Sequence, residues 1–393
     1  MKTLADLLKV EENKTLLINW AETGRKVLQG KAQREGIKLA EPDGVENLLK
    51  QAEVLAESRI ICESSGLNLA DEVQIFWQEI EKRGVLLTQR DYLQASVVAL
   101  SFQHRFARTD FGTSRQRGFG QSWGDAIQGL LGEIAFTKLV SQATSGQVIP
   151  IISADRMEID EALTADVSKV LIDGKKPIKP AVRISIKATK LNGRWLDVPY
   201  NQTEHSDVFV LVKLGTDADS LFTFLAGVSS LAKVLEVYKN AGLKPLFDKE
   251  EEAAEEARRS IEWLASRQHP VLAVVAGWQT KEELQETFTA FCHNGSSARK
   301  KLTVYSGKGS IGTKAERLPG KIEYFPYFEP PSTLEEIFFY PIGDFTKTNH
   351  SVCSTDLLKT DLNELIRKLR TPQTSTALSP SDIQTGGVPH EDA

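Results

Sequence analysis

The segment DVSKVLIDGKKPIKPAVRISIKAT, residues 166–189, carries the most regular pattern in the chain. Its last eight residues alternate apolar and polar side chains, and this period of two predicts a strand with one apolar face. Its first eight residues are rich in β-branched side chains and predict a second strand. The glycine and two prolines between them are typical of a turn. An antiparallel hairpin of these two strands would place Asp166 opposite Lys187.

The pair of Asp166 and Lys187 has two interpretations. It can be an ordinary cross-strand ion pair that only stabilises the sheet. A functional interpretation is favoured by residues 120–140, whose apolar side chains at helical spacing predict a nearly buried helix that contains Glu133. A carboxylate there is costly unless it is paired or binds a cation. The alternative for Glu133 is a residue at the helix edge that caps or pairs locally.

Together, these features resemble the PD-(D/E)XK, or restriction-endonuclease-like, nuclease superfamily. Members carry an acid on a helix, an acid that opens one strand, and an acid-x-Lys motif on the next strand. The matching positions, all between residues 118 and 215, are Glu133, Asp166, Ser185, Ile186 and Lys187. The chain departs from the motif at Ser185, where an acid is expected, so Glu133 gains importance and Asp197 is a reserve ligand. The resemblance implies an α/β fold with a three-layer core around a mixed β-sheet.

The resemblance also implies the chemistry of the site. Glu133, Asp166 and Ile186 would hold Mg²⁺, for which Mn²⁺ can substitute, and Ser185 and Lys187 would complete the catalytic set. Mg²⁺ uses one or two carboxylates plus a substrate phosphate, and it polarises the phosphoryl oxygen and lowers the pKa of bound water. Lys187 would position the attacking water and stabilise the developing charge. The expected activity is that of a type II restriction or phage-defence endonuclease, which hydrolyses double-stranded DNA.

The expected partners follow from that activity. Cleavage of both strands predicts a homodimer, because a two-fold pair matches the symmetry of palindromic duplex DNA. A methyltransferase or another defence-system protein is the expected protein partner.

Two other functions remain open. One is a nucleic-acid-binding or assembly subunit with a nuclease-like fold and weak or no catalysis, which Ser185 favours. The other is a non-nuclease α/β protein in which Asp166 and Lys187 form a structural pair.

The composition is that of an ordinary soluble protein. Of 393 residues, 41% are hydrophobic, and the formal net charge is −5, so any nucleic-acid-binding surface must be local. The three cysteines lie far apart without metal-ligand spacing, which argues against structural zinc and a disulfide framework. The sequence contains no apolar run long enough for a transmembrane helix and begins without a signal-peptide pattern. We therefore expect a cytoplasmic protein that does not enter a membrane.

The sequence predicts four successive regions. They are an all-helical N-terminal region (1–106), the nuclease core (107–290), a basic and aromatic region for DNA contact (291–370), and a disordered tail (371–393). Beyond the hairpin, the core is expected to contain strands at 207–213, 221–227 and 270–277 and helices at 229–238, 248–262 and 280–288. Strands that alternate with helices favour a three-layer α/β core.

Basic residues near the motif and in two glycine-rich segments are candidates for DNA contact. Arginine and lysine bind phosphates, and neighbouring aromatic side chains can stack on exposed bases. Solvated loops or hairpins are the alternative for both glycine-rich segments. The candidates are Arg115, Arg117, Lys190, Arg194, Arg299, Lys300, Lys301, Lys308 and Lys314.

Overall fold

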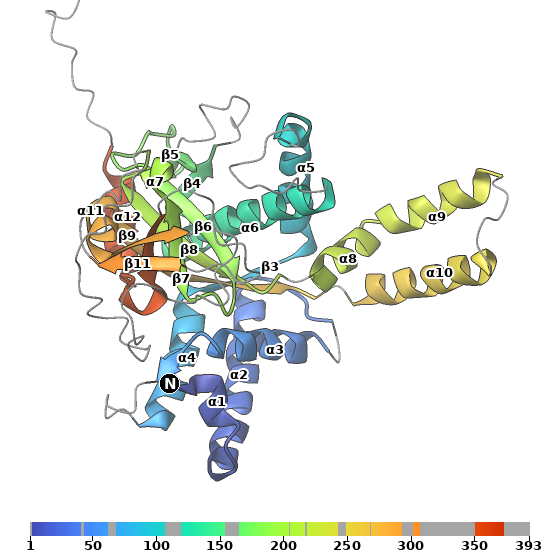
Figure 1. Ribbon diagram of the computed structural model, residues 1–393, viewed down its shortest axis with the longest axis horizontal. Helices are drawn as coiled ribbons and strands as arrows, with labels where there is room; N and C mark the ends of the chain where they lie inside the picture. The colour runs from blue at the N-terminus through green and yellow to red at the C-terminus, as the bar shows by residue number, and fades with distance from the viewer. Residues whose placement is uncertain are drawn as a thin grey trace, which may run out of the picture.

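The computed structural model shows a layered α/β body from which one pair of helices projects (Figure 1). The residues described are 2–40, 43–61, 68–106, 119–153, 165–203, 205–216, 218–242, 249–267, 269–292, 302–306 and 350–372. The helices are α1 (Leu4–Leu8), α2 (Lys14–Arg34), α3 (Gly44–Ala56), α4 (Leu69–Arg83), α5 (Gln89–Phe106), α6 (Phe119–Ala143), α7 (Tyr200–Thr203), α8 (Ala218–Gly227), α9 (Ser230–Asn240), α10 (Glu250–Ser266), α11 (Lys281–Thr287) and α12 (Leu362–Arg370). The strands are β1 (Lys2–Thr3), β2 (Ile60–Ile61), β3 (Gly84–Leu87), β4 (Val148–Ile152), β5 (Val167–Ile172), β6 (Ile184–Lys190), β7 (Trp195–Pro199), β8 (Val208–Leu214), β9 (Val271–Thr280), β10 (Phe288–Cys292), β11 (Leu302–Ser306) and β12 (His350–Ser354).

A four-stranded mixed sheet in the order β3-β9-β8-β6 forms the centre of the fold. Strands β6 and β8 are parallel, whereas β9 is antiparallel to both β8 and β3. Every residue of β8 is buried, which explains its almost continuous apolar sequence VFVLVKL. Because successive residues of a strand point to opposite faces, both faces of this sheet need cover.

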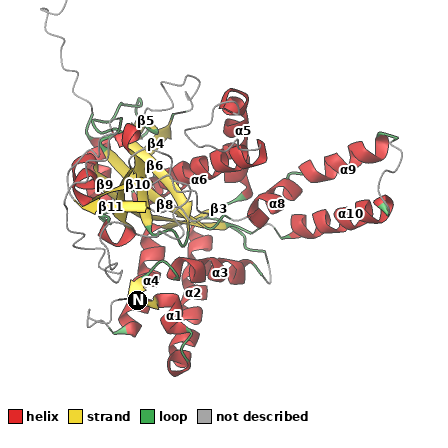
Figure 2. Cartoon of the chain, viewed as in Figure 1, coloured by secondary structure: helices red, strands yellow, loops and turns green. Residues whose placement is uncertain are grey.

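Different layers cover the two faces of the central sheet. Val210 and Val275 belong to the core cluster that α5 and α6 complete on one face. On the opposite face, Leu272 and Val274 pack against α2, α3 and α4. On that same face, Phe209 packs against β7. The chain is therefore a mixed α/β protein in which a mixed sheet lies between layers (Figure 2).

The remaining strands form smaller ladders around this core. A second sheet has the order β11-β10-β12-β7, and its neighbouring strands are antiparallel. The pairing of β12 with β7 brings the C-terminal part of the chain next to the motif region. Helix α12 contributes Leu365 and Leu369 to the core cluster on the α6 side, near β5.

Most of the elements expected after the motif are confirmed, but one strand is wrong. Residues 221–227 lie within helix α8. Leu221, Phe224 and Leu225 lie on one side of a helix because they are three and four residues apart. Phe224 stacks on Tyr92 of α5 with a distance of 5.3 Å between ring centroids. A short apolar run does not distinguish a buried strand from a buried helix, and here tertiary packing selects the helix.

The N-terminal region is not all-helical. Strand β3 extends the central sheet beside β9, and β1 pairs with β2 in a short ladder. Val85, Leu86 and Leu87 are all buried, so β3 has apolar cover on both faces although it lies at the edge of the sheet. The helix expected after it is confirmed as α5, and the backbone N–H of Thr88 donates to the carboxylate of Asp91 at 2.7 Å.

Helices α9 and α10 form an arm that extends away from the sheet (Figure 1). Neither helix contains a buried residue. Among the described helices, no single one is long and apolar enough to cross a membrane. The segments Ser220–Gly227 and Ser230–Asn240, which meet at a bend, reach the required length and hydropathy only when they are counted together.

Candidate functional site

Asp166 lies where strands β4, β5 and β6 meet. It directly precedes β5, and its backbone N–H donates to the carbonyl of Ile184, the first residue of β6, at 2.9 Å. Its own carbonyl accepts a hydrogen bond from the N–H of Ser153, just after β4. Since β6 is the last strand of the central sheet, Asp166 lies along the edge of that sheet.

The side chain of Asp166 binds the motif strand directly. Its Oδ2 atom accepts hydrogen bonds from the backbone N–H of Ile186 at 2.5 Å and from the Oγ of Ser185 at 3.2 Å. The N–H and the carbonyl of one residue in a strand point to the same edge, so the carbonyl of Ile186 also points towards Asp166. Asp166, Ser185 and Ile186 therefore form one polar cluster, with Ser185 only 6% exposed.

The predicted hairpin is wrong in its pairing. Strand β5 pairs antiparallel with β4, whereas β6 pairs parallel with β8. The linker between β5 and β6 provides the physical reason. Val170 and Ile178 exchange two backbone hydrogen bonds of 2.8 and 2.9 Å, so the linker itself occupies a pairing position beside β5. Asp166 is consequently aligned with residues 184–186 and is not the direct cross-strand partner of Lys187.

Lys187 belongs to the other face of β6. It pairs in register with Leu211, whose side chain lies in the cluster between β8 and β7. Its Nζ donates to the Oε1 of Gln202 in α7 at 2.6 Å. The sequence did not point to Gln202, because residues 200–203 form no motif and the contact depends on how α7 folds back onto the sheet. The hydrogen bond fixes the position of the ammonium group.

Glu133 lies in the middle of α6, on the opposite side of β6 from Lys187. The preceding residue, Gly132, approaches the sheet so closely that a Cβ atom there would lie 2.9 Å from the Cβ of Ala188. Thr144 directly follows α6, and its N–H still donates to the carbonyl of Val140 as in a helix, so it lies about three turns beyond Glu133 on the same flank. Its hydroxyl accepts a hydrogen bond from the N–H of Val148 in β4. Glu133 thus lies on the flank of α6 nearer to β4, and it is 3% exposed, as its position in an apolar run predicts.

The oxygen atoms available at this site fit a magnesium ion in chemical type. The carboxylate of Asp166 and the backbone carbonyl of Ile186 are hard ligands that suit Mg²⁺. Glu133 carries a second carboxylate of the same chemical type, but it lies on α6 and not in the cluster of Asp166, Ser185 and Ile186. Within the described ranges, no group of three or more His, Cys, Asp or Glu side chains is placed to hold a metal. A site with at most two carboxylates leaves the other positions to water and substrate phosphate, which is the usual arrangement for Mg²⁺.

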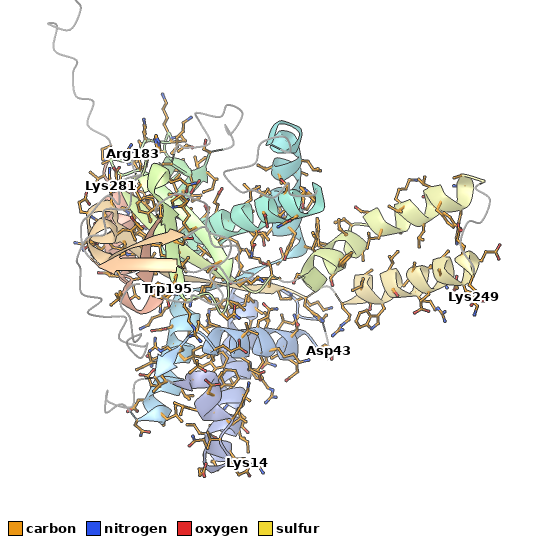
Figure 3. All side chains as sticks on the ribbon, in the orientation of Figure 1. Lys14, Asp43, Arg183, Trp195, Lys249 and Lys281 are labelled. Carbon is orange, nitrogen blue, oxygen red and sulfur yellow. The ribbon has the colours of Figure 1, made fainter. Side chains whose placement is uncertain are left out.

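A charged cluster lies at the start of β6 and β8. Arg183 donates to the carboxylate of Asp207 through its backbone N–H at 2.8 Å and its guanidinium at 2.7 Å. Burial opposes ionisation of Asp207, but the hydrogen bonds and charge of Arg183, with the charge of Lys281, lower its pKa below its ordinary value of 3.8. Figure 3 shows Arg183 and Lys281 near each other at this end of the sheet.

Two of the expected DNA-contact residues lie in the described part of the chain. Lys190 ends β6, is exposed, and lines a cavity of about 450 Å³. The guanidinium of Arg194 donates to the carbonyl of Glu57, directly after α3, at 3.1 Å, so Arg194 is bound to the layer formed by α2, α3 and α4. The residues outside the described ranges are Arg115, Arg117, Arg299, Lys300, Lys301, Lys308 and Lys314.

The reserve ligand Asp197 lies on β7. Its neighbours Leu196 and Val198 face β8, and successive residues of a strand alternate, so Asp197 is on the face of β7 that points away from the central sheet. It is not part of the cluster that Asp166 forms with Ser185 and Ile186.

The structural centre of the site is therefore the contact of Asp166 with β6. Glu133 and Lys187 belong to the layers on the two sides of that strand. The chain matches no protein-family model, no curated protein and no solved structure.

Proposed function

We propose that this chain is a Mg²⁺-dependent endonuclease that hydrolyses phosphodiester bonds in double-stranded DNA. The observation that carries the proposal is the contact between the Asp166 carboxylate and the backbone of Ile186, the residue before Lys187. An acid that opens one strand thus meets the strand that bears the lysine, as in the PD-(D/E)XK superfamily. The order of a helix with Glu133, a strand opened by Asp166 and a strand with Lys187 supports a restriction-endonuclease-like core.

The contacts of each side chain suggest its role in this reaction. Two hydrogen bonds to one oxygen of Asp166 fix the orientation of its carboxylate, which is what a preorganised metal ligand needs. Lys187, held by Gln202, would position the attacking water and stabilise charge that develops on the phosphate. When bound, Mg²⁺ would neutralise part of the phosphate charge and activate that water.

Ser185 stands where the superfamily motif has an acid. Its hydroxyl donates to Asp166, so its role here is to orient that carboxylate. The second carboxylate of the site would then come from Glu133. Glu133→Gln should therefore weaken Mg²⁺ binding while it preserves the shape of the buried side chain.

A metal titration of plasmid cleavage tests the proposal. Supercoiled plasmid incubated with the wild-type protein should become nicked or linear only when Mg²⁺ or Mn²⁺ is present. Asp166→Ala should abolish this cleavage, while the affinity for duplex DNA in a gel-shift assay stays largely unchanged. Plasmid that remains supercoiled at every metal concentration would refute the nuclease assignment.

A second function, that of a nucleic-acid-binding or assembly subunit, is favoured by a specific observation. Ser185 replaces the expected acid, and its hydroxyl and the N–H of Ile186 both bind the same oxygen of Asp166. This arrangement stabilises the strand junction without any metal. Gel-shift binding that needs no metal, together with uncut plasmid, would support this function in place of catalysis.

The proposed activity also predicts an oligomeric state, a homodimer. Cleavage of both strands of a palindromic site requires two active sites, and a two-fold homodimer provides them. Linear plasmid formed without an accumulating nicked intermediate would support a dimer, and a neighbouring methyltransferase gene would support a role in restriction.

A further inference from the structure

A cavity of about 370 Å³ lies away from the Asp166 cluster, where the helical layer, α5, α8 and the end of α10 meet the start of β9. Its walls come from segments spread between residues 37 and 271, so the cavity exists only in the folded chain. Figure 3 shows Asp43 near this place, at the base of the arm, and Lys249 at the tip. The volume is in the range of small-molecule sites.

His269 lines this cavity, and within the described ranges its ring makes no hydrogen bond. Both of its ring nitrogens are buried, and neither has a hydrogen-bond partner among the residues that the structure describes. Burial and the charge of Arg267 lower the pKa of His269 below its ordinary value of 6.5, although Asp43 acts in the other direction. The ring is therefore neutral at pH 7 and offers one donor and one acceptor. Since buried polar groups are normally paired, a molecule in the cavity should supply the matching atoms.

The walls around His269 combine flat apolar surfaces with positive charge. Tyr92 and Phe224 stack on each other and line one side of the cavity. Arg267 also lines the cavity, and its guanidinium lies 4.5 Å from the centre of the Trp263 ring. Of the described lining residues, none is acidic, and Lys38 adds a second cation. Such walls suit a planar molecule that carries a negative group at one end.

We propose that this cavity binds a nucleoside monophosphate. The base has hydrogen-bond donors and acceptors on its edge, which the neutral ring of His269 can match. Tyr92 and Phe224 provide an apolar surface for the flat base. The phosphate is the group that Arg267 and Lys38 attract. This inference does not rest on the proposed nuclease function, because none of the cavity residues belongs to the Asp166 cluster.

Calorimetric titration of the full chain with AMP, GMP, CMP and UMP in turn, in buffer with EDTA, tests this inference. At least one mononucleotide should bind with 1:1 stoichiometry, and the matching nucleoside and inorganic phosphate should each bind about tenfold or more weakly. His269→Phe, which keeps an aromatic ring but removes both nitrogens, should weaken binding by about tenfold or more. Arg267→Met should remove the advantage of the nucleotide over the nucleoside.

Two control variants show whether nucleotide binding depends on this cavity. Arg259→Ala removes a cation of α10 that pairs with Glu256 and does not line the cavity, so it should leave nucleotide affinity unchanged. Asp166→Ala should also leave it unchanged, which would separate this site from the proposed nuclease centre. The inference is overturned if none of the four mononucleotides binds at millimolar concentration, or if His269→Phe, shown to be folded by thermal unfolding, binds as the wild type does. If His269→Phe fails to fold, equal nucleotide affinity of Arg267→Met and the wild type overturns it.

Discussion

The central sheet and the α9–α10 arm differ in how far they bury their apolar side chains. Strand β8 buries all 7 of its residues, whereas neither helix of the arm contains a buried one. Val234 in α9 is 65% exposed and Trp263 in α10 is 55% exposed. The sheet is therefore stabilised by burial and close packing, whereas most of the arm surface remains in contact with solvent.

The arm relies on local interactions instead. Arg258 of α10 pairs with Glu255 at 2.6 Å and with Glu262 one turn away. Exposed pairs of this kind stabilise a helix only weakly, because solvent screens the charges. Substitutions of the same kind should therefore change the free energy of unfolding strongly in the sheet layers and weakly in the arm.

The largest effect is expected where α6 crosses the sheet. Gly132→Val would place a branched side chain against Ala188, which a Cβ atom alone would already approach to 2.9 Å. Overpacking of this kind should lower the free energy of unfolding by about 3 kcal/mol. Gly129→Val is the matched control, because a Cβ atom at Gly129 would meet nothing within 4 Å. Urea unfolding that gives the same free energy for both variants would contradict the described packing of α6 on β6.

A smaller loss is expected at the strand junction. Asp166→Leu removes the oxygen that accepts hydrogen bonds from the Ile186 N–H and the Ser185 hydroxyl. Because these two donors are then left unpaired in a partly buried place, the free energy of unfolding should fall by about 2 kcal/mol. Glu256→Leu in the arm removes an exposed ion pair with Arg259 and should change it by less than about 0.5 kcal/mol. Equal losses in urea unfolding would show that Asp166 has no structural role at β6.

The pH dependence of stability should show the same contrast. The pKa of Asp207 is lower in the folded chain than its ordinary value of 3.8, so its ionised form stabilises the fold above that pH. This contribution is lost as the pH falls below 3.8 through the lower folded value. Asp207→Asn should therefore lose less stability than the wild type when the pH is lowered from about 5 to about 3, as measured by thermal unfolding. An identical pH profile for the two proteins would contradict the role of the Arg183 contact.

The smallest effect is expected at the outer surface of the arm. Val237 of α9 is exposed, so Val237→Ala should change the free energy of unfolding by less than about 0.5 kcal/mol. A loss above about 1 kcal/mol would show that Val237 is packed in solution against something else, such as a second copy of the chain.

Much of the fold could be predicted from local sequence patterns. The apolar run around Glu133, the alternation in residues 182–189 and the continuous apolar strand at residues 207–213 each correspond to the observed element. Strand pairing could not be predicted in the same way, because it depends on which segments meet in space. The bridge between Val170 and Ile178 is an example, since neither residue signals that the linker folds back on β5.

Part of the candidate site was also predictable from the sequence. The motif placed Asp166 near residues 185–187, and the structure joins Asp166 to Ser185 and Ile186. The sequence did not reveal Gln202, which binds Lys187 from α7, or the cavity around His269. Both depend on contacts between separate elements of the folded chain, and single residues of these types carry no motif.

The proposed chemistry is tested most sharply by the rate of plasmid cleavage by Lys187→Gln under single-turnover conditions with saturating Mg²⁺. Lys169→Gln, which removes an exposed lysine from the neighbouring strand β5, is the matched control. If Lys187 stabilises the charge that develops at the phosphate, its replacement should slow cleavage by about 100-fold or more, while Lys169→Gln cleaves at the wild-type rate. Equal metal-dependent rates for Lys187→Gln and the wild type would contradict the catalytic role of Lys187 and, with it, the proposed nuclease mechanism.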